Sequence, residues 1–460
     1  MLIRFNIKNF LSFSDREDGR SEEFSMIAGK VRSKKEHLYE DGKLKLLKFA
    51  AVYGANASGK SNLVKALDFM QRIVVSGFPE GHTDRYCKVA AECRDQESYF
   101  ELEILLNDKY YAYGFEVILN QSRFTSEWLV ELTADNKERL IFSRDIVKGT
   151  YEFGGAVKTK GLLEKLNVYA EDIQEDSSVL LLSIMNQNKK TLYQQFEQAA
   201  IFQDVYMWIR NGLDINYPDR PISDYSYMAE TENVEEICRI IAAFGTGITD
   251  FQMVEVPAEK VLGHLPKKIQ EDLLADMEKK TVDRKTELDE AATGIIMRSN
   301  RDFFILNIDK EGNMICRTIK FSHGKKNILF ELSEESDGTV RLLDLLEVLL
   351  SESGKTYIID ELDRCLHPGL TYKFVETFLE LAAQRNIQLI VTTHESRLLD
   401  FDLLRRDEIW FVNKRRSGES DIYSLEEYNV RFDQKIDKAY LEGRYGGVPV
   451  FNTVFPVREV

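Results

Sequence analysis

The feature of this chain that most constrains its fold is the stretch Tyr53–Ser61, which reads YGANASGKS. It fits the pattern G-x-x-x-x-G-K-[ST], in which a glycine-rich loop joins a strand to a helix. Residues 46–53 are apolar enough for a short buried strand, and residues 62–70 carry apolar side chains at helical spacing. A chance glycine turn is the alternative, but it would not explain both flanks. The stretch therefore predicts an α/β protein with a phosphate-binding loop.

Each part of this loop has a chemical role in binding a nucleoside triphosphate. Successive backbone N–H groups turn inward as an anion nest, and the N-terminus of the helix adds partial positive charge. Lys60 is expected to reach the β- and γ-phosphates of ATP, and the Ser61 hydroxyl is expected to hold Mg²⁺. The residues expected to contact the nucleotide here are Gly54, Ala55, Asn56, Ala57, Ser58, Gly59, Lys60, Ser61 and Asn62.

A second stretch supplies the carboxylates that hydrolysis needs. Residues 356–361 read TYIIDE, which predicts an apolar strand ending in two adjacent acidic residues. Asp360 is expected to hold Mg²⁺ opposite Ser61, and Glu361 is expected to orient or deprotonate the attacking water. Following a phosphate loop, this arrangement predicts hydrolysis of ATP to ADP and phosphate.

Two more positions fit the same chemistry. Residues 387–394, IQLIVTTH, predict a buried strand with His394 at its C-terminal end, where ligands lie in α/β sheets. An imidazole there could bridge the γ-phosphate and the catalytic water, whereas the alternative is a core histidine. Ser336, Gly338 and Thr339 precede an apolar helical run. A serine and a glycine at a helix start form either an N-terminal anion site or a plain helix cap.

Composition sets limits on the class of protein. The chain has 460 residues, of which 43% are hydrophobic and 30% charged, so we expect a soluble globular protein with two or three structural units. The five cysteines form no C-x-x-C pair, there is no apolar run of membrane-spanning length, and no signal-peptide pattern is present. We therefore expect a cytoplasmic protein without a membrane partner.

Charge bears on the partners. The formal net charge of −16 argues against coating nucleic acid with the whole surface, although a local basic groove stays open. The pair Arg405–Arg406 and the run Lys414–Arg416 could touch nucleic acid or an acidic partner, and the alternative is a solubilising surface.

The order of patterns along the chain predicts four segments. Residues 1–95 carry the N-terminal part of an ATPase core, and residues 96–158 form an antiparallel β-lobe with a hairpin turn at Asn107–Asp108. Residues 159–295 are mainly helical, including a charge-rich stretch over residues 269–292 that reads as a short arm or a solvated helix face. Residues 296–460 complete the ATPase core.

Taken together, these motifs resemble those of ABC-type ATPase heads of the SMC and RecF kind. The opening segment Asn9–Phe13, NFLSF, resembles the first strand of those heads. Several stretches of the sequence resemble more closely those of the RloA/AbiLi group of bacterial ATPases, to which the ATPase of PARIS-type phage defence is also similar. The resemblance rests on the stretches ESDGTVRLLDL, IIDELDRCLHPGL, IVTTHESRLLD, LLRRDEIWFVNK and AYLEGRYGGVP, and it covers residues 1–70 and about 296–460 well.

The resemblance implies an ABC-type P-loop NTPase head with an antiparallel β-lobe and a mainly helical insertion. At least two heads would pair as a homo-oligomer and sandwich ATP. In this family the signature motif, here Ser336, Gly338 and Thr339, contacts the γ-phosphate held by the other subunit, and His394 would be the switch histidine. His367 stands where the family has an aspartate, so its role across the subunits stays open. Candidates for the family's glutamine loop are Gln71, Gln174 and Gln187, among which the sequence does not choose.

The resemblance also implies a biological role. It points to the sensor or regulator of a separately encoded toxic effector, often a nuclease, in an anti-phage system of the abortive-infection or toxin–antitoxin kind with a phage-encoded trigger. Two alternatives remain open on the sequence. One is a RecF-like DNA-repair ATPase that clamps DNA, and the other is a scaffold that binds ATP without hydrolysing it.

Overall fold

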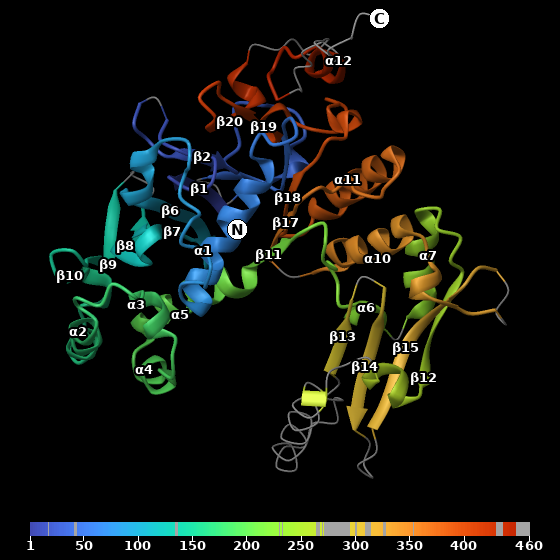
Figure 1. Cartoon of the computed structure of the whole chain (residues 1–460), viewed down its shortest axis with the longest axis horizontal. Coiled ribbons are helices and arrows are strands. Elements are labelled where there is room, and N and C mark those ends of the chain that lie inside the picture. The colour runs from blue at the N-terminus through green and yellow to red at the C-terminus, as the bar shows by residue number, and fades with distance from the viewer. Residues whose placement is uncertain are drawn as a thin grey trace, which may run out of the picture. The chain divides into compact units, whose positions relative to one another are not determined.

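The computed structural model contains two compact units. The first comprises Met1–Ile215, Glu352–Leu362 and Val375–Val460, and the second comprises Asn216–Ser351 and Asp363–Phe374. Both units contain helices and strands, which confirms the predicted α/β class (Figure 1). The structure describes the chain except residues 17, 41–43, 134–136, 230, 232, 264–266, 269, 271–294, 300, 309–313, 325–327, 353, 429–435 and 448–460.

The core of the first unit is a sheet in which the described strands follow the order β11-β17-β18-β5-β19-β20. These strands are β5 (Phe49–Tyr53), β11 (Leu213–Asn216), β17 (Thr356–Ile359), β18 (Gln388–Thr392), β19 (Ile409–Lys414) and β20 (Ser420–Ser424). From β17 to β19 the pairing is parallel, and β20 is antiparallel. Strands β5, β17 and β18 are buried along their whole length, as parallel strands covered on both faces are. The order places β18 between β5 and β17.

A second sheet of the first unit is antiparallel, with the described strands in the order β10-β9-β8-β7-β6-β1-β2. Its strands are β1 (Leu2–Lys8), β2 (Glu22–Ser25), β6 (Ser98–Leu106), β7 (Lys109–Ile118), β8 (Arg123–Leu132), β9 (Glu138–Asp145) and β10 (Thr150–Phe153). Asn107 and Asp108 join β6 to β7 with φ of 50° and 59°, the left-handed backbone of a tight hairpin turn. The predicted antiparallel lobe is therefore confirmed, and β1 joins it by pairing with β6.

The first unit also contains helices, several of them in the segment after β10. They are α1 (Lys60–Ser76), α2 (Leu162–Asp172), α3 (Leu181–Met185), α4 (Lys190–Gln195), α5 (Ala200–Met207) and α12 (Ile436–Leu441). Helix α11 (Pro368–Ala382) begins in the second unit and ends in the first. A short sheet pairs β3 (Leu38–Glu40) with β4 (Lys45–Leu47).

The second unit contains a sheet in the order β12-β15-β14-β13, with β16 paired to β15. Its strands are β12 (Asp250–Val256), β13 (Ile295–Arg298), β14 (Phe303–Ile308), β15 (Met314–Ser322) and β16 (Phe330–Glu331). Helices of this unit include α6 (Ser226–Ala229), α7 (Val234–Ala243), α8 (Ala258–Leu262) and α10 (Asp337–Leu350). Strand β12 falls in the stretch predicted to be mainly helical. It pairs with β15 far along the chain, and local spacing does not reveal a partner at that distance.

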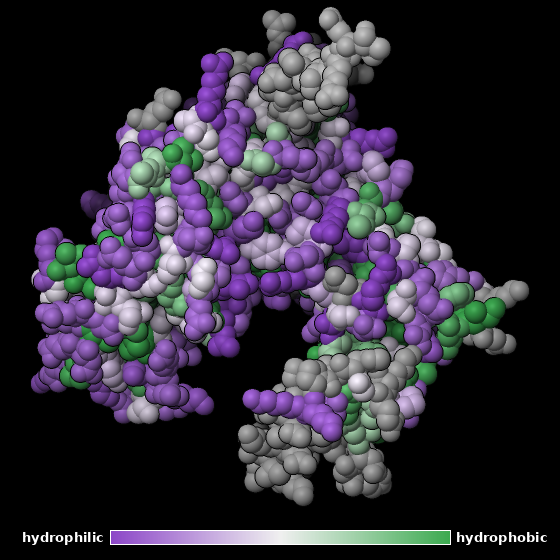
Figure 2. Space-filling model, viewed as in Figure 1, coloured by the Kyte–Doolittle hydropathy of each residue, from purple (hydrophilic) through white to green (hydrophobic). Residues whose placement is uncertain are grey.

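The predicted charge-rich arm over residues 269–292 lies, except for Gln270, outside the described residues. None of the helices in the described part of the chain is long and apolar enough to cross a membrane. Figure 2 shows hydrophilic residues over much of the visible described surface, in agreement with a charged content of 30%.

Candidate active site

The phosphate loop lies between β5 and α1, as the sequence predicts. Helix α1 begins at Lys60, and Gly59 before it has φ of 118°. Ala57 also has a positive φ, of 63°. Left-handed residues interleaved with ordinary backbone build the concave turns that bind anions. The loop and the start of α1 therefore form a backbone suited to phosphate.

Glycine is required at both fixed positions of the loop. A Cβ atom on Gly54 would collide with the Ser58 hydroxyl and with the backbone oxygen of Val412, and the backbone oxygen cannot move aside as a flexible side chain can. A Cβ on Gly59 would collide with the Ser420 hydroxyl, and its φ adds strain for any L side chain. The loop conformation therefore depends on contacts with β19 and β20, which follow it by more than 300 residues.

Lys60 is held at the loop. Its side chain is nearly buried, and its Nζ donates to the backbone oxygens of Gly54 at 2.7 Å and Ala55 at 3.2 Å. These bonds satisfy part of a buried ammonium, whose burial without partners would be costly. The amine is thus confined to the loop to which the sequence assigned it.

A group of hydroxyl and amide side chains braces the loop from three separate parts of the chain. The Ser12 Oγ accepts from Asn62 Nδ2 at 2.8 Å and lies 2.8 Å from Ser420 Oγ. Ser420 Oγ also donates to the backbone oxygen of Ser58. Sequence reasoning missed Ser12 and Ser420 in this role, although Ser12 lies in the NFLSF segment that resembles the opening strand of ATPase heads.

The predicted pair of metal-binding side chains meets in the structure. Ser61 Oγ donates to Asp360 Oδ1 at 3.1 Å, although the two residues are 299 positions apart. Asp360 is only 3% exposed, and its Oδ1 also accepts from Thr392 Oγ1 at 2.6 Å. Thr392 Oγ1 in turn accepts from the backbone N–H of Glu361 at 2.8 Å. Thr392 lies at the end of β18, the strand between β5 and β17, and its hydroxyl positions both Asp360 and Glu361. Sequence reasoning did not single out this residue.

Glu361 and His394 follow neighbouring parallel strands at the same edge of the sheet. Glu361 comes two residues after β17 and has a left-handed backbone with φ of 51°, while exposed His394 comes two residues after β18. A strained turn at a strand end is common where a side chain serves a site. Ligands of α/β sheets bind at this edge, so both residues stand where a reacting phosphate would lie.

The residues present fit a magnesium nucleotide. Mg²⁺ is usually held by one or two carboxylates together with phosphate oxygens and water, and Ser61 with Asp360 supplies such a set beside the loop. In the described part of the chain, no cluster of three or more histidine, cysteine or acidic side chains suits a metal held by protein alone. Ser61 and Asp360 would hold Mg²⁺ together with the phosphates of its nucleotide.

The predicted signature residues lie in the second unit, at the start of α10. Ser336 is the N-cap, and its Oγ accepts from the backbone N–H of Thr339 at 3.1 Å. A Cβ on Gly338 would press on the backbone oxygen of Cys365. His367 Nδ1 accepts from the backbone N–H of Gly369 at 3.1 Å, at the start of α11. Ser336 therefore forms the predicted helix cap, and its contact with a nucleotide stays a prediction.

Two of the three candidate glutamines bind backbone in the first unit. Gln71 Nε2 donates to the backbone oxygens of Ile209 and Leu213, each at 2.8 Å. Gln174 donates to the backbone oxygen of Gly149, and Gln187 is exposed. These contacts tie α1 and the segment after α2 to other parts of the first unit, and the choice of a glutamine loop stays open.

The hypothesis that Arg405 forms part of an exposed basic pair is wrong. Arg405 is 1% exposed, and its guanidinium donates to Asp407 at 2.6 and 2.9 Å and to backbone oxygens of Val31 and Ser33. The carboxylate and the carbonyl groups around the guanidinium offset the desolvation cost of burying an arginine. Arg405 therefore ties the segment between β18 and β19 to residues 31–33, and its guanidinium is not available to a partner.

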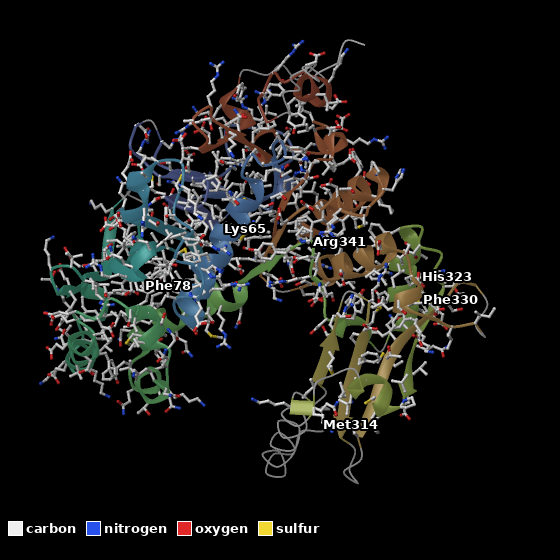
Figure 3. All side chains as sticks on the ribbon, viewed as in Figure 1. Lys65, Phe78, Met314, His323, Phe330 and Arg341 are labelled. Carbon is white, nitrogen blue, oxygen red and sulfur yellow. The ribbon has the colours of Figure 1, made fainter. Side chains whose placement is uncertain are left out.

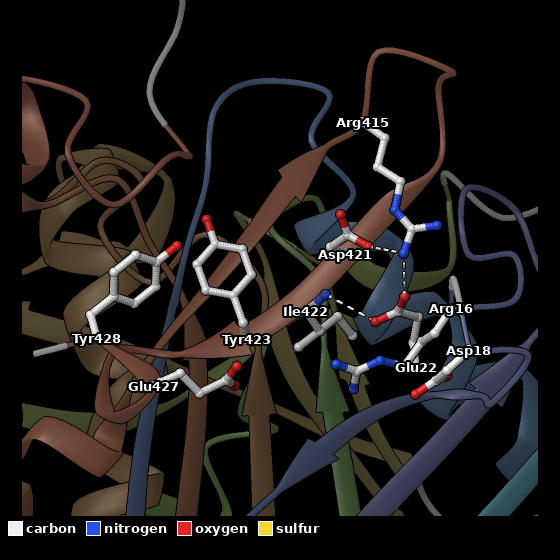
Figure 4. Close-up of a pocket in the computed structure, with 9 residues that line it drawn as sticks. All are labelled: Arg16, Asp18, Glu22, Arg415, Asp421, Ile422, Tyr423, Glu427 and Tyr428. Carbon is white, nitrogen blue, oxygen red and sulfur yellow. Dashed lines mark hydrogen bonds and ion pairs between the residues drawn. The ribbon is translucent and has the colours of Figure 1, made fainter.

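Arg415 is also engaged within the first unit. Its guanidinium pairs with Glu22 at 3.4 Å and with Asp421 at the rim of a pocket of about 570 Å³ (Figure 4). Glu22 accepts from the backbone N–H of Ile422 at 3.1 Å. Burial raises the pKa of the Glu22 carboxyl to about 7, against the effect of Arg415. This part of the basic run is thus neutralised by the chain itself.

Comparisons with known proteins found similar solved structures and a matching family model. Solved structures similar to this chain include an SMC head bound to the C-winged helix domain of ScpA, with 13% identity over 93% of this chain and 99% of that one and a TM-score of 0.39. The SMC head domain from Thermotoga maritima gives 14% identity, 92% and 98% coverage and a TM-score of 0.35. A third structure is an SMC head domain with an extended coiled coil bound to the C-terminal domain of ScpA, derived from Pyrococcus furiosus. It has 14% identity over 96% of this chain and 99% of that one, with a TM-score of 0.37.

The comparison with curated proteins gave no match. A protein-family model described as "AAA domain, putative AbiEii toxin, Type IV TA system" matches residues 49–400. The matched range begins at β5 and includes the phosphate loop, Asp360, Glu361 and His394. The chain therefore belongs to this family of AAA domains.

Proposed function

We propose that this chain is a cytoplasmic ATP-hydrolysing ATPase of the ABC type that acts as the sensor and regulatory scaffold of a bacterial anti-phage system. In this proposal it controls a separately encoded toxic effector, such as a nuclease, and responds to a phage-encoded trigger. The observation that carries the ATPase part is the 3.1 Å hydrogen bond between Ser61 and Asp360 beside the glycine loop.

The positions of the side chains support the catalytic roles that we propose. The loop backbone and Lys60 bind the phosphates, and Ser61 and Asp360 hold the Mg²⁺ that comes with them. Glu361 orients or deprotonates the water, and His394 contacts the terminal phosphate from the next strand end. Thr392 supports this assignment, because one hydroxyl sets the place of the Asp360 carboxylate and of the Glu361 backbone.

Two copies complete the site in this proposal. Ser336, Gly338 and Thr339 of one copy close over the ATP held by the loop of the other, so that ATP binding favours a head-to-head dimer. The start of the 14-residue helix α10, with its N-terminal partial charge, supports contact with a phosphate. ATP-dependent closure and opening of the dimer would then be the switch that holds or releases the effector.

The role in defence rests on different support. Membership of a family whose description names a putative AbiEii toxin and a Type IV TA system favours a toxin–antitoxin or abortive-infection setting. The acidic charge balance and the internal pairing of Arg405 and Arg415 reduce the cationic surface that a DNA clamp would use.

The experiment that tests the proposal is purification of the chain expressed with its genomic neighbours, in wild-type and Glu361→Gln forms, with and without ATP. We expect wild type to hydrolyse ATP and Glu361→Gln to bind ATP, lose hydrolysis and accumulate as a closed oligomer. We expect a second protein to elute with it at fixed stoichiometry and little DNA. Lys60→Ala is the control for nucleotide binding, and it should neither hydrolyse ATP nor close.

Other results would redirect the assignment. An oligomer that retains DNA at moderate salt, without a protein partner, would replace the sensor by a RecF-like DNA-repair ATPase whose affinity for DNA falls steeply with salt. Full biological activity of Glu361→Gln with hydrolysis lost would point to a scaffold that needs ATP only for assembly.

A further inference from the structure

A pocket in the second unit is lined by an excess of arginines. It has a volume of about 170 Å³ and lies beside the first two turns of α10. The arginines are Arg220, Arg301, Arg341 and Arg364, and the acidic residues are Asp337 and Asp344. Arg341 lies on α10 and is 7% exposed (Figure 3).

Both carboxylates of the pocket are already paired. Asp337 forms an ion pair with Arg301, which also donates to the backbone oxygen of Glu335 at 2.7 Å. Asp344 pairs at 3.1 Å with Arg298, which does not line the pocket. Two lining carboxylates thus face four lining arginines, so the lining residues carry an excess of positive charge.

Arg220 and Arg364 are the exposed arginines that line this pocket. Within the described residues, no carboxylate lies within 4.0 Å of either guanidinium, and Arg220 contacts only the ring of Tyr217, at 5.8 Å. Arginine forks bind phosphate with two parallel hydrogen bonds, so cations of this kind around a small cavity suit an oxyanion. The volume is below the roughly 300 Å³ at which pockets for whole small molecules begin, so one phosphate group fits better than a nucleotide.

We propose that this arginine pocket binds the terminal phosphate of a nucleotide held by the phosphate loop of a second copy. This inference rests on the proposed function, in which Ser336 and Gly338 close over the nucleotide of another copy. Asp337 stands between those two residues and lines the pocket, so the approach that brings Ser336 to the phosphate brings the arginines there as well. Arg220 and Arg364 would then supply positive charge to the site of hydrolysis from the opposite subunit.

Cys365 provides a direct probe of the pocket. It lines the pocket and is the exposed cysteine of the chain, whereas Cys87, Cys93, Cys238 and Cys316 are buried. A neutral maleimide should therefore modify the native protein at Cys365 alone, and the rate can be followed by intact mass. A phosphate in the pocket should slow this modification.

The source of the phosphate is tested with a mixture of two variants. One chain carries Lys60→Ala, so it binds no nucleotide but keeps Cys365, and the other carries Cys365→Ser and Glu361→Gln, so it retains ATP. We expect ATP to slow modification of the Lys60→Ala chain about tenfold or more in the mixture, and to leave its rate unchanged when that chain is alone.

Removing the charges of two pocket arginines distinguishes protection of Cys365 by bound phosphate from burial of Cys365 in the dimer. With Arg220→Gln and Arg364→Gln added to the Lys60→Ala chain, the mixture should lose the slowing. Both residues are exposed, so we expect these changes to leave folding intact. Arg239→Gln, at an exposed arginine of α7 in the same unit that does not line the pocket, is the matched control and should leave the slowing in place.

The other outcomes overturn the inference. Slowing that survives in the double glutamine variant would show burial by the partner and no role for the arginines. Slowing of the lone Lys60→Ala chain by inorganic phosphate, without a further effect of mixing, would assign the pocket to free phosphate. ATP-dependent association in light scattering without slowing would refute the pocket alone, and absence of association would refute the proposed dimer as well.

Discussion

Thr392→Val is the substitution that tests most directly how the fold builds the site. The change keeps the shape of the side chain and removes one hydroxyl, which donates to Asp360 Oδ1 at 2.6 Å and accepts from the Glu361 backbone at 2.8 Å. Thr392 is 1% exposed, so water cannot easily replace the lost donor. A buried hydrogen bond to a charged group contributes about 1.5–3 kcal/mol, and we expect the free energy of unfolding to fall by about 2 kcal/mol.

The effect on catalysis should be larger than the effect on stability. Asp360 would lose one of the two hydroxyl groups that donate to its Oδ1 atom, and Glu361 would lose the hydrogen bond that fixes its strained backbone. A misplacement of about 1 Å in a catalytic group costs on the order of 10²-fold in rate. We therefore expect the kcat for ATP hydrolysis to fall about 10²-fold, with a smaller change in KM.

The control is Thr371→Val. Thr371 is fully buried, and its Oγ1 has no hydrogen-bond partner in the described part of the chain, so the same chemical change should not lower the free energy of unfolding. Urea unfolding and steady-state ATP hydrolysis measure the two effects. Wild-type kcat and an unchanged urea midpoint in Thr392→Val would refute the idea that this hydroxyl positions the two acidic residues.

Three further predictions concern stability and the loop. Gln388→Leu should lower the free energy of unfolding by about 3 kcal/mol in urea titration, because the fully buried amide bonds both backbone groups of Leu2, which would be left unpaired. Gly54→Ala should abolish nucleotide binding in a fluorescent-ATP assay while leaving the circular dichroism spectrum intact, because its Cβ would collide with the backbone of Val412. The raised pKa of Glu22, about 7 against 4.5, means that the folded state holds its proton more tightly. Its contribution to stability is present below pH 4.5 and is lost as the pH rises through about 7. Between about pH 5 and pH 8, the Tm of the wild type should therefore fall by more than the Tm of Glu22→Gln. Equal decreases in Tm would contradict this reasoning.

The predictions from the sequence were wrong for Arg405 and missed strand β12 for the same physical reason, because both depend on partners far along the chain. Arg405 looks like surface in the sequence because an isolated arginine is costly to bury. Its burial becomes favourable only when Asp407 and carbonyls from residues 31–34 converge on it, and these partners are up to 374 residues away. Strand β12 was missed because it pairs with β15 far along the chain, and local spacing does not show which distant segments pair.

The sequence by itself determined the local elements of the site. The phosphate loop, the strand that ends in Asp360 and Glu361, and the helix start at Ser336 are each encoded in a few consecutive residues, because glycine φ angles, apolar runs and caps act over short distances. Only the tertiary structure decided how these pieces meet. Placing β18 between β5 and β17 brings the Thr392 hydroxyl to Asp360, and Ser420 reaches the phosphate loop only because β20 joins the same sheet. These contacts depend on strand order, which is a property of the whole packed core and not of any one segment.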